Sequence, residues 1–209
     1  MPSKFRIRYV FRPLVILIAK GLIKIGITPN IATILMLIFS ILSCFSLIIL
    51  QNLLIFAILV FITGILDGCD GAIARILGKT TKFGGVFDST MDRISEFFIF
   101  MGLLVFLRNE LLWNLIDVKL IIYISFLSSI LISYCRARAA IFFKGDFDIG
   151  LMARSERLFY LFITMIVANF YGYTIELLFI FMWLVIGTFT YRMIRIYYMI
   201  KKRDNNAGG

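Results

Sequence analysis

Histidine is absent from this 209-residue sequence, and cysteine and proline occur only three times each. The absence of histidine excludes histidine general bases, histidine-containing triads and imidazole metal ligands. The cysteines Cys44, Cys69 and Cys135 are odd in number and form no C-x-x-C pair, so neither a disulfide framework nor a zinc site is indicated. Any metal in this chain must therefore be bound by oxygen, which favours Mg²⁺, Mn²⁺ or Ca²⁺.

Charged residues are also scarce. They make up 16% of the chain, while 61% of the residues are hydrophobic and the mean hydropathy is +0.98. Soluble domains are closer to half apolar, so the excess must face lipid. We expect one all-α polytopic membrane domain over residues 1–209, with a six-helix bundle over 28–203 and a polar tail over 204–209. The predicted spans are Ile31–Leu50, Leu53–Leu77, Val86–Leu107, Leu120–Phe143, Leu158–Phe170 (extended backward by Arg154–Arg157) and Ile175–Ile200.

The N-terminal segment, residues 1–27, is too charged to span a membrane. Between Lys4 and Lys24 it mixes arginines and lysines with large apolar residues, which predicts an amphipathic helix lying on the membrane surface. A cleaved signal peptide is disfavoured, because no small-residue cleavage site follows a short apolar core. The sequence Thr28-Pro29-Asn30 then breaks the chain and predicts the start of the next helix.

Basic residues outnumber acidic ones by 22 to 12, which gives a net charge of +10. These charges flank the apolar spans, so they indicate membrane orientation and anionic headgroups or substrates, and no nucleic-acid partner is expected. With the N-terminus in the cytoplasm, only Arg108 and Lys119 fall on the outer side. We therefore predict a multi-pass protein of the cell membrane with both termini and the active site cytoplasmic.

Four aspartates interrupt two of the predicted spans. Asp67 and Asp70 are three residues apart and Asp88 and Asp92 are four apart, so each pair shares one face of its helix. The short connection over 76–85 makes the two helices antiparallel neighbours. A carboxylate in a membrane helix is costly and indicates function by default. Four converging carboxylates favour two divalent ions, the arrangement that clamps attacking and leaving oxygens in phosphoryl displacement.

Small residues and one arginine accompany these acids. Gly71, Ala74 and Gly84 would let a bulky ligand approach the backbone, although helix packing alone would also account for single glycines. Arg75 can neutralise a diphosphate.

The spacing Asp67-x-x-Asp70-Gly71-x-x-Ala74-Arg75, then eight residues, then Gly84-x-x-x-Asp88-x-x-x-Asp92, resembles the signature of the CDP-alcohol phosphotransferase family. The resemblance implies that the four aspartates bind two Mg²⁺ or Mn²⁺ ions and that Asp92 is also the general base. It implies a CDP site lined by Asn30, Asp70, Gly71, Ala74, Arg75 and Gly84. In the implied reaction, an acceptor hydroxyl attacks the phosphorus distal to the cytidine, Asp92 takes its proton and CMP leaves. It also implies a homodimer.

A second polar set lies in the C-terminal half of the chain. The segments around Ser133-Tyr134-x-Arg136 and Arg154-x-Glu156-Arg157 resemble the inositol-phosphate branch of the family, which includes phosphatidylinositol phosphate and archaetidylinositol phosphate synthases. The resemblance implies a phosphorylated polyol acceptor, inositol phosphate, held by Ser133, Arg136, Arg154 and Arg195. The sequence departs from that pattern at Ala140 and Ala153. The donor would be a CDP-lipid carrying a diacylglycerol or archaeol phosphate.

Other functions stay open at this stage. The same chemistry could use glycerol phosphate or serine as acceptor, or a CDP-polyol as donor. A small cation transporter would also place acids in membrane helices, but here the acids cluster at one membrane face and the rest of the spans lack polar residues. A structural membrane partner without chemistry would not explain four buried acids.

Overall fold

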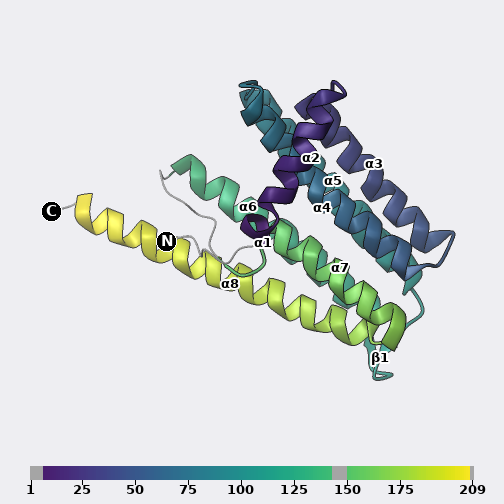
Figure 1. The fold of residues 1–209 in the computed structure, drawn as a ribbon. Helices are drawn as coiled ribbons and strands as arrows, with labels where there is room; N and C mark the ends of the chain where they lie inside the picture. Colours follow the sequence, from purple (N-terminus) through teal and green to yellow (C-terminus); the bar gives the residue numbers. More distant parts are fainter. Residues whose placement is uncertain (1–6, 143–149, 208–209) are drawn as a thin grey trace.

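The computed structural model describes residues 7–142 and 150–207, and this part of the chain is almost entirely helical (Figure 1). The predicted all-helical fold class is confirmed. The elements in chain order are α1 (Ile7–Val10), α2 (Arg12–Lys24), α3 (Pro29–Ile48), α4 (Leu53–Ile76), α5 (Lys82–Phe106), β1 (Leu111–Leu112), β2 (Ile116–Asp117), α6 (Val118–Phe142), α7 (Arg154–Tyr171) and α8 (Thr174–Ala207).

Four of these helices are long and apolar enough to cross a membrane. They are α3, α4, α6 and α8, over Pro29–Ile48, Leu53–Ile76, Val118–Ile141 and Thr174–Lys201. The other two predicted spans coincide with α5 and α7, which carry more charged side chains along their first turns. The chain is therefore a helical membrane protein, and the full count of six spans stays a prediction.

Local sequence signals set where the helices begin and end. Pro29 occupies the first turn of α3, where its missing N–H is not needed. The side chain of Asn52 accepts a hydrogen bond from the Ile55 backbone N–H at 2.9 Å at the start of α4, and Thr81 accepts one from Gly84 N–H at 2.9 Å at the start of α5. Gly172 ends α7 in a left-handed conformation, with φ of 79°.

The helices pack in a bundle with a large apolar core, and a smaller apolar cluster joins α2, α3 and the last turns of α4. α3 packs on both α4 and α5, α4 also packs on α7, and α6 packs on α8. Large buried side chains such as Phe56, Phe100 and Phe181 fill the core. At Gly102 in α5, an added Cβ would lie 2.9 Å from the Cys44 backbone, so the close approach of α3 and α5 depends on glycine.

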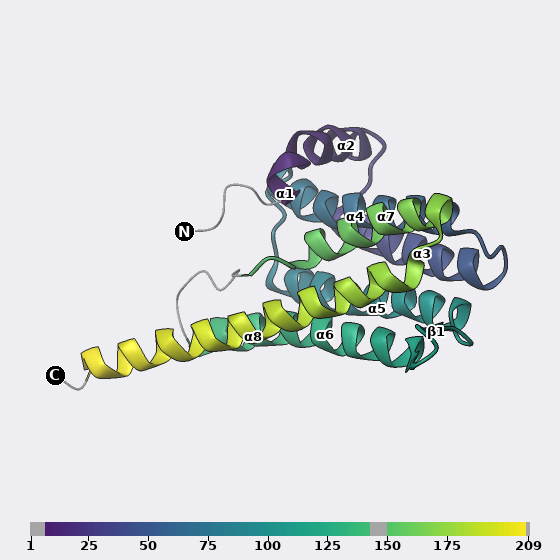
Figure 2. The same cartoon turned by 90° about the horizontal axis from the view of Figure 1, so that it is seen from below.

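The N-terminal segment forms two helices rather than one. α2 lies along the outer side of α4, away from α6 and α8 (Figure 2). Its Val15 contacts Gly68 of α4, where a Cβ would be 3.2 Å from the Val15 methyl groups. The predicted interfacial position of this segment stays a prediction.

Two features were not anticipated from the sequence. A short antiparallel ribbon of β1 and β2 joins α5 to α6 and turns through Trp113 and Asn114, both at positive φ. In addition, α8 continues as helix to Ala207, into the segment expected to be a polar tail, and this end extends beyond the other helices (Figure 2).

Candidate active site

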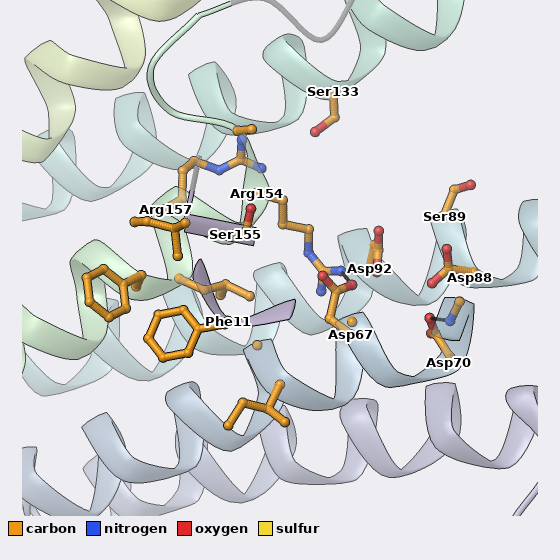
Figure 3. Close-up of a pocket in the computed structure, with 18 of the residues that line it drawn as sticks. Phe11, Asp67, Asp70, Asp88, Ser89, Asp92, Ser133, Arg154, Ser155 and Arg157 are labelled. Atoms are coloured by element: carbon orange, nitrogen blue, oxygen red, sulfur yellow. Dashed lines mark hydrogen bonds and ion pairs between the residues drawn. The ribbon is translucent and has the colours of Figure 1, made fainter. Parts of the chain in front are cut away.

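A cavity of about 930 Å³ lies where α4 ends and α5 and α7 begin. We call it the polar cavity, and its lining includes Asp67, Asp88, Asp92, Ser133 and Arg154 (Figure 3). Side chains from α1, α2, α4, α5, α6, α7 and α8 all reach it. Acidic groups thus face basic ones from segments far apart in the sequence.

Three of the four predicted metal-binding aspartates form a close group. Carboxylate oxygens of Asp67, Asp88 and Asp92 all lie within 4.8 Å of one another. Asp88 Oδ1 is buried and has no hydrogen-bond partner among the described residues. Oxygen donors in this arrangement are the ligands that Mg²⁺ and Mn²⁺ prefer, so these residues fit a divalent ion.

Asp70 also lines the polar cavity but is engaged differently. It is only 5% exposed, and its Oδ2 accepts a hydrogen bond from the Thr33 hydroxyl of α3 at 2.9 Å. Its Oδ1 accepts from the backbone N–H of Gly71. Asp70 is thus tied to α3, outside the close group, and its predicted role in metal binding stays a prediction.

The guanidinium of Arg154 reaches into the carboxylate group (Figure 3). Its Nη1 pairs with both Asp67 and Asp92, and its Nη2 donates to the Ser95 hydroxyl at 2.7 Å. Arg93 pairs with the other oxygen of Asp92 at 3.2 Å. Two arginines therefore offset part of the negative charge that the aspartates concentrate here.

A second ion pair lies one helical turn deeper. Arg157 Nε and Nη2 donate to the two carboxylate oxygens of Glu96 at 2.8 and 3.0 Å. The sequence alone predicts no role for this pair. The signal was present in the spacing, because Glu96 follows Asp92 by four residues and Arg157 follows Arg154 by three.

The other predicted site residues divide into two groups. Gly71, Arg75, Ser133 and Arg136 line the polar cavity with Arg154, whereas Asn30, Ala74, Gly84 and Arg195 are not among its lining residues. At Gly71, an added Cβ would lie 3.2 Å from Arg75 Nη1, so glycine leaves room for that guanidinium. Gly84 donates its N–H to Thr81 at the beginning of α5. The predicted roles of all these residues remain predictions.

Four arginines in the lining were not predicted as site residues: Arg93 and Arg157, described above, and Arg12 and Arg192. Arg12 reaches the polar cavity from α2, which the sequence predicts only as part of a surface helix. Arg192 of α8 also lines it, is 1% exposed and donates from Nη1 to the Ile132 carbonyl at 2.8 Å. Arg192 precedes the predicted acceptor residue Arg195 by three residues. Residues three apart share one face of a helix, so Arg195 lies about one turn further along α8, beyond the lining of the polar cavity.

Comparison with known proteins identifies the family of this chain. Residues 26–191 match the family described as CDP-alcohol phosphatidyltransferase. The chain is 36% identical over 146 residues to the archaetidylinositol phosphate synthase of Pyrococcus horikoshii, covering 70% of this chain and 73% of that protein. It is 37% identical over 157 residues to the phosphatidylinositol phosphate synthase of Mycobacterium tuberculosis, covering 74% and 70%.

Solved structures of a phosphatidylinositol phosphate synthase have a similar fold. The crystal structure of the Mycobacterium tuberculosis phosphatidylinositol phosphate synthase with CDP-DAG bound matches with a TM-score of 0.75 at 28% identity, covering 88% of this chain and 94% of that one. The same enzyme in complex with manganese and citrate matches with a TM-score of 0.75 at 30% identity, covering 88% of each. That manganese complex and the group of three carboxylates support the predicted divalent-metal cofactor. The resemblance carried by residues 67–92 is confirmed, and the chain belongs to the CDP-alcohol phosphatidyltransferase family.

Proposed function

We propose that this chain transfers a phosphatidyl-type group, diacylglycerol or archaeol phosphate, from a CDP-lipid to a hydroxyl of inositol phosphate, releasing CMP. The observation that carries this proposal is the polar cavity, where three clustered carboxylates face several arginines at one end of a helical membrane bundle. The relatives support it, since one is named an archaetidylinositol phosphate synthase and another a phosphatidylinositol phosphate synthase.

Asp67, Asp88 and Asp92 would hold the metal, and we assign Asp70 to a second ion beside them. When bound, divalent ions would stabilise the negative charge on the phosphate oxygens of the donor. Mutual repulsion among these carboxylates is otherwise relieved by Arg154 and Arg93, which pair with Asp67 and Asp92.

We assign the donor to the part of the cavity near Gly71 and Arg75. There the arginine guanidinium lies over a glycine with no side chain, so a diphosphate can approach the backbone. Asn30, Asp70, Ala74 and Gly84 would complete the nucleotide site around the junction of α3, α4 and α5. Asp92, which faces the cavity from α5, would accept the proton of the attacking hydroxyl.

We assign the acceptor to the side of the cavity formed by α6 and α7. Ser133 and Arg136 line it from α6 and Arg154 from α7, and Arg195 would join them from α8. Arginines bind phosphate with paired hydrogen bonds, so this side of the cavity suits an acceptor that already carries a phosphate. An uncharged acceptor such as free inositol would leave these guanidinium groups without an anionic partner.

We further propose that all six helices from α3 to α8 span the cell membrane and that α2 lies at its cytoplasmic surface. The cavity would then open to the cytoplasm, where CDP-lipid headgroups and soluble acceptors meet. A homodimer is proposed from the family resemblance.

The test is a measurement of CMP release by the purified protein in lipid. CDP-diacylglycerol and CDP-archaeol are each offered with inositol phosphate, glycerol phosphate, serine and inositol, with Mg²⁺ or Mn²⁺ present. We expect CMP release to be fastest with inositol phosphate. Preference for another alcohol would reassign the acceptor, and no CMP release with any pair, together with no CDP binding, would favour the cation transporter.

A further inference from the structure

Helices α5 and α7 both border the polar cavity, yet each packs its backbone mainly on other helices. α5 packs on α3 and α6, while α7 packs on α4 and α8. Among the described residues, long polar side chains link α5 and α7 by hydrogen bonds and ion pairs: Arg154 reaches Asp92 and Ser95, and Arg157 reaches Glu96. At the cavity, arginine side chains thus link these two walls, while further along the helices Ile99 of α5 and Leu161 of α7 belong to the same apolar core.

The Glu96–Arg157 pair is the more buried of these links. The two side chains are 3% and 1% exposed, and the guanidinium makes a paired contact with both carboxylate oxygens, at 2.8 and 3.0 Å. Arg157 Nη1 also donates to the Met152 carbonyl at 3.1 Å. One arginine thus connects α5, α7 and the segment that leads into α7.

The two arginine links have a common register. Glu96 lies one turn beyond Asp92 on α5, and Arg157 lies one turn beyond Arg154 on α7, so the pairs follow each other in the same order. A shift or rotation of α7 that broke the buried pair would also move Arg154 away from Asp67 and Asp92. The reverse does not hold, because Arg154 is more exposed, at 12%, and its side chain can swing within the cavity.

We propose that Glu96 and Arg157 are positioning residues that fix where the Arg154 guanidinium stands relative to the carboxylates Asp67, Asp88 and Asp92. The pair does not touch the reacting atoms, and it acts only through Arg154. A buried ion pair contributes little net stability compared with apolar side chains of similar size. Its directional paired geometry, by contrast, sets register in a way that apolar contacts do not. This inference rests on the proposed function only where it concerns the acceptor.

The test compares the double variant Glu96→Leu/Arg157→Met with the unmodified protein, each with Arg154 intact and with Arg154→Ala. Replacing both partners leaves no unpaired buried charge, so the double variant is expected to fold. The first measurement is Mn²⁺ affinity, from the electron paramagnetic resonance signal of free Mn²⁺, without donor or acceptor. The second is the KM for inositol phosphate against kcat.

With Arg154 intact, we expect the double variant to change Mn²⁺ affinity by at least about twofold. Residues that share one network of hydrogen bonds and ion pairs usually affect one another by at least this much. We expect the acceptor KM to rise more than kcat falls. In the Arg154→Ala background both effects of the double variant should vanish. Equal effects with and without Arg154 would overturn the proposal, because the pair would then act on the fold in general.

Two further variants keep the test decisive. Arg157→Lys retains the charge but cannot make the paired contact, so it should show the same dependence on Arg154 even if the double variant does not fold. Leu103→Ala, in the buried core of α5, is the matched control for general loosening. If Leu103→Ala shifts Mn²⁺ affinity as much as the pair does, the positioning role is wrong. Because Mn²⁺ binding needs no substrate, the Mn²⁺ affinity measurement tests the positioning role even if inositol phosphate is not the acceptor.

Discussion

The two ends of this bundle are held together in different ways. α4 belongs to both: its first half contributes Phe56, Ala57 and Val60 to the apolar core, and its last turns carry Asp67 and Asp70. At the core end, close packing of apolar side chains and small residues keeps the helices in place. At the cavity end, a smaller apolar cluster that includes Ala32 and Ile73 is joined by hydrogen bonds and ion pairs between distant segments. Substitutions at the two ends should therefore separate activity from stability.

The largest effect should come from removing the divalent metal at the cavity end. Excess chelator should abolish CMP release, because the clustered carboxylates of Asp67, Asp88 and Asp92 would lose the ions they are arranged to hold. Adding back Mg²⁺ or Mn²⁺ should restore it. Thermal unfolding should move much less, since the apolar core holds no such group. Full turnover in excess chelator would contradict the metal mechanism.

Next in size is the substitution Asp92→Asn, which keeps the shape of the side chain but removes its charge and basicity. Loss of a general base lowers turnover by a factor of about 10² to 10⁴, and loss of a metal ligand would add to this. We expect the variant to fold and to bind the CDP-donor measurably. Asp67→Asn should instead weaken metal and donor binding together. Donor affinity and CMP release in both variants provide the comparison, and near-normal turnover in Asp92→Asn would remove that residue from the chemistry.

A smaller effect is expected at the acceptor side of the cavity. Arg154→Ala should raise the KM for inositol phosphate by roughly 10- to 100-fold, because a hydrogen bond to a charged group contributes about 1.5–3 kcal/mol. Arg195→Ala should raise it less, since Arg195 does not line the cavity described above. The donor KM serves as the internal control in both variants. If neither substitution changes acceptor affinity, the acceptor carries no phosphate or binds elsewhere.

The smallest change in activity should come from the core end. Gly102→Ala would place a Cβ 2.9 Å from the Cys44 backbone and force α3 and α5 apart. Such overpacking costs about 1–3 kcal/mol, which should lower the melting temperature in detergent by a few degrees. The matched control is Gly187→Ala in α8, where an added Cβ meets nothing within 4 Å. Turnover per folded molecule should stay the same in both variants. An equal loss of stability in both would show that the close α3–α5 contact is not the cause of the loss in Gly102→Ala.

Much of the fold was predictable because its signals are local. The predicted span Leu53–Leu77 matches α4 to within one residue at its end, since an apolar run flanked by Asn52 and a loop identifies a helix without knowledge of its neighbours. α5 begins at Lys82, four residues before the predicted span, because Thr81 caps the helix in a polar stretch that hydropathy alone does not include. The ribbon of β1 and β2 escaped prediction, because pairs of two residues leave no periodic pattern.

The sequence by itself determined the family, the helical membrane fold and the face of each helix that carries aspartates, because spacings of three and four residues map directly onto a helix surface. Only the tertiary structure decided which of those groups meet. Asp70 accepts a hydrogen bond from Thr33, 37 residues away in the sequence. Arg154 pairs with Asp67 across 87 residues, and Arg157 pairs with Glu96 across 61 residues. Such contacts depend on how each helix is rotated and shifted against its neighbours. That arrangement results from packing over the whole bundle, and no short stretch of sequence specifies it.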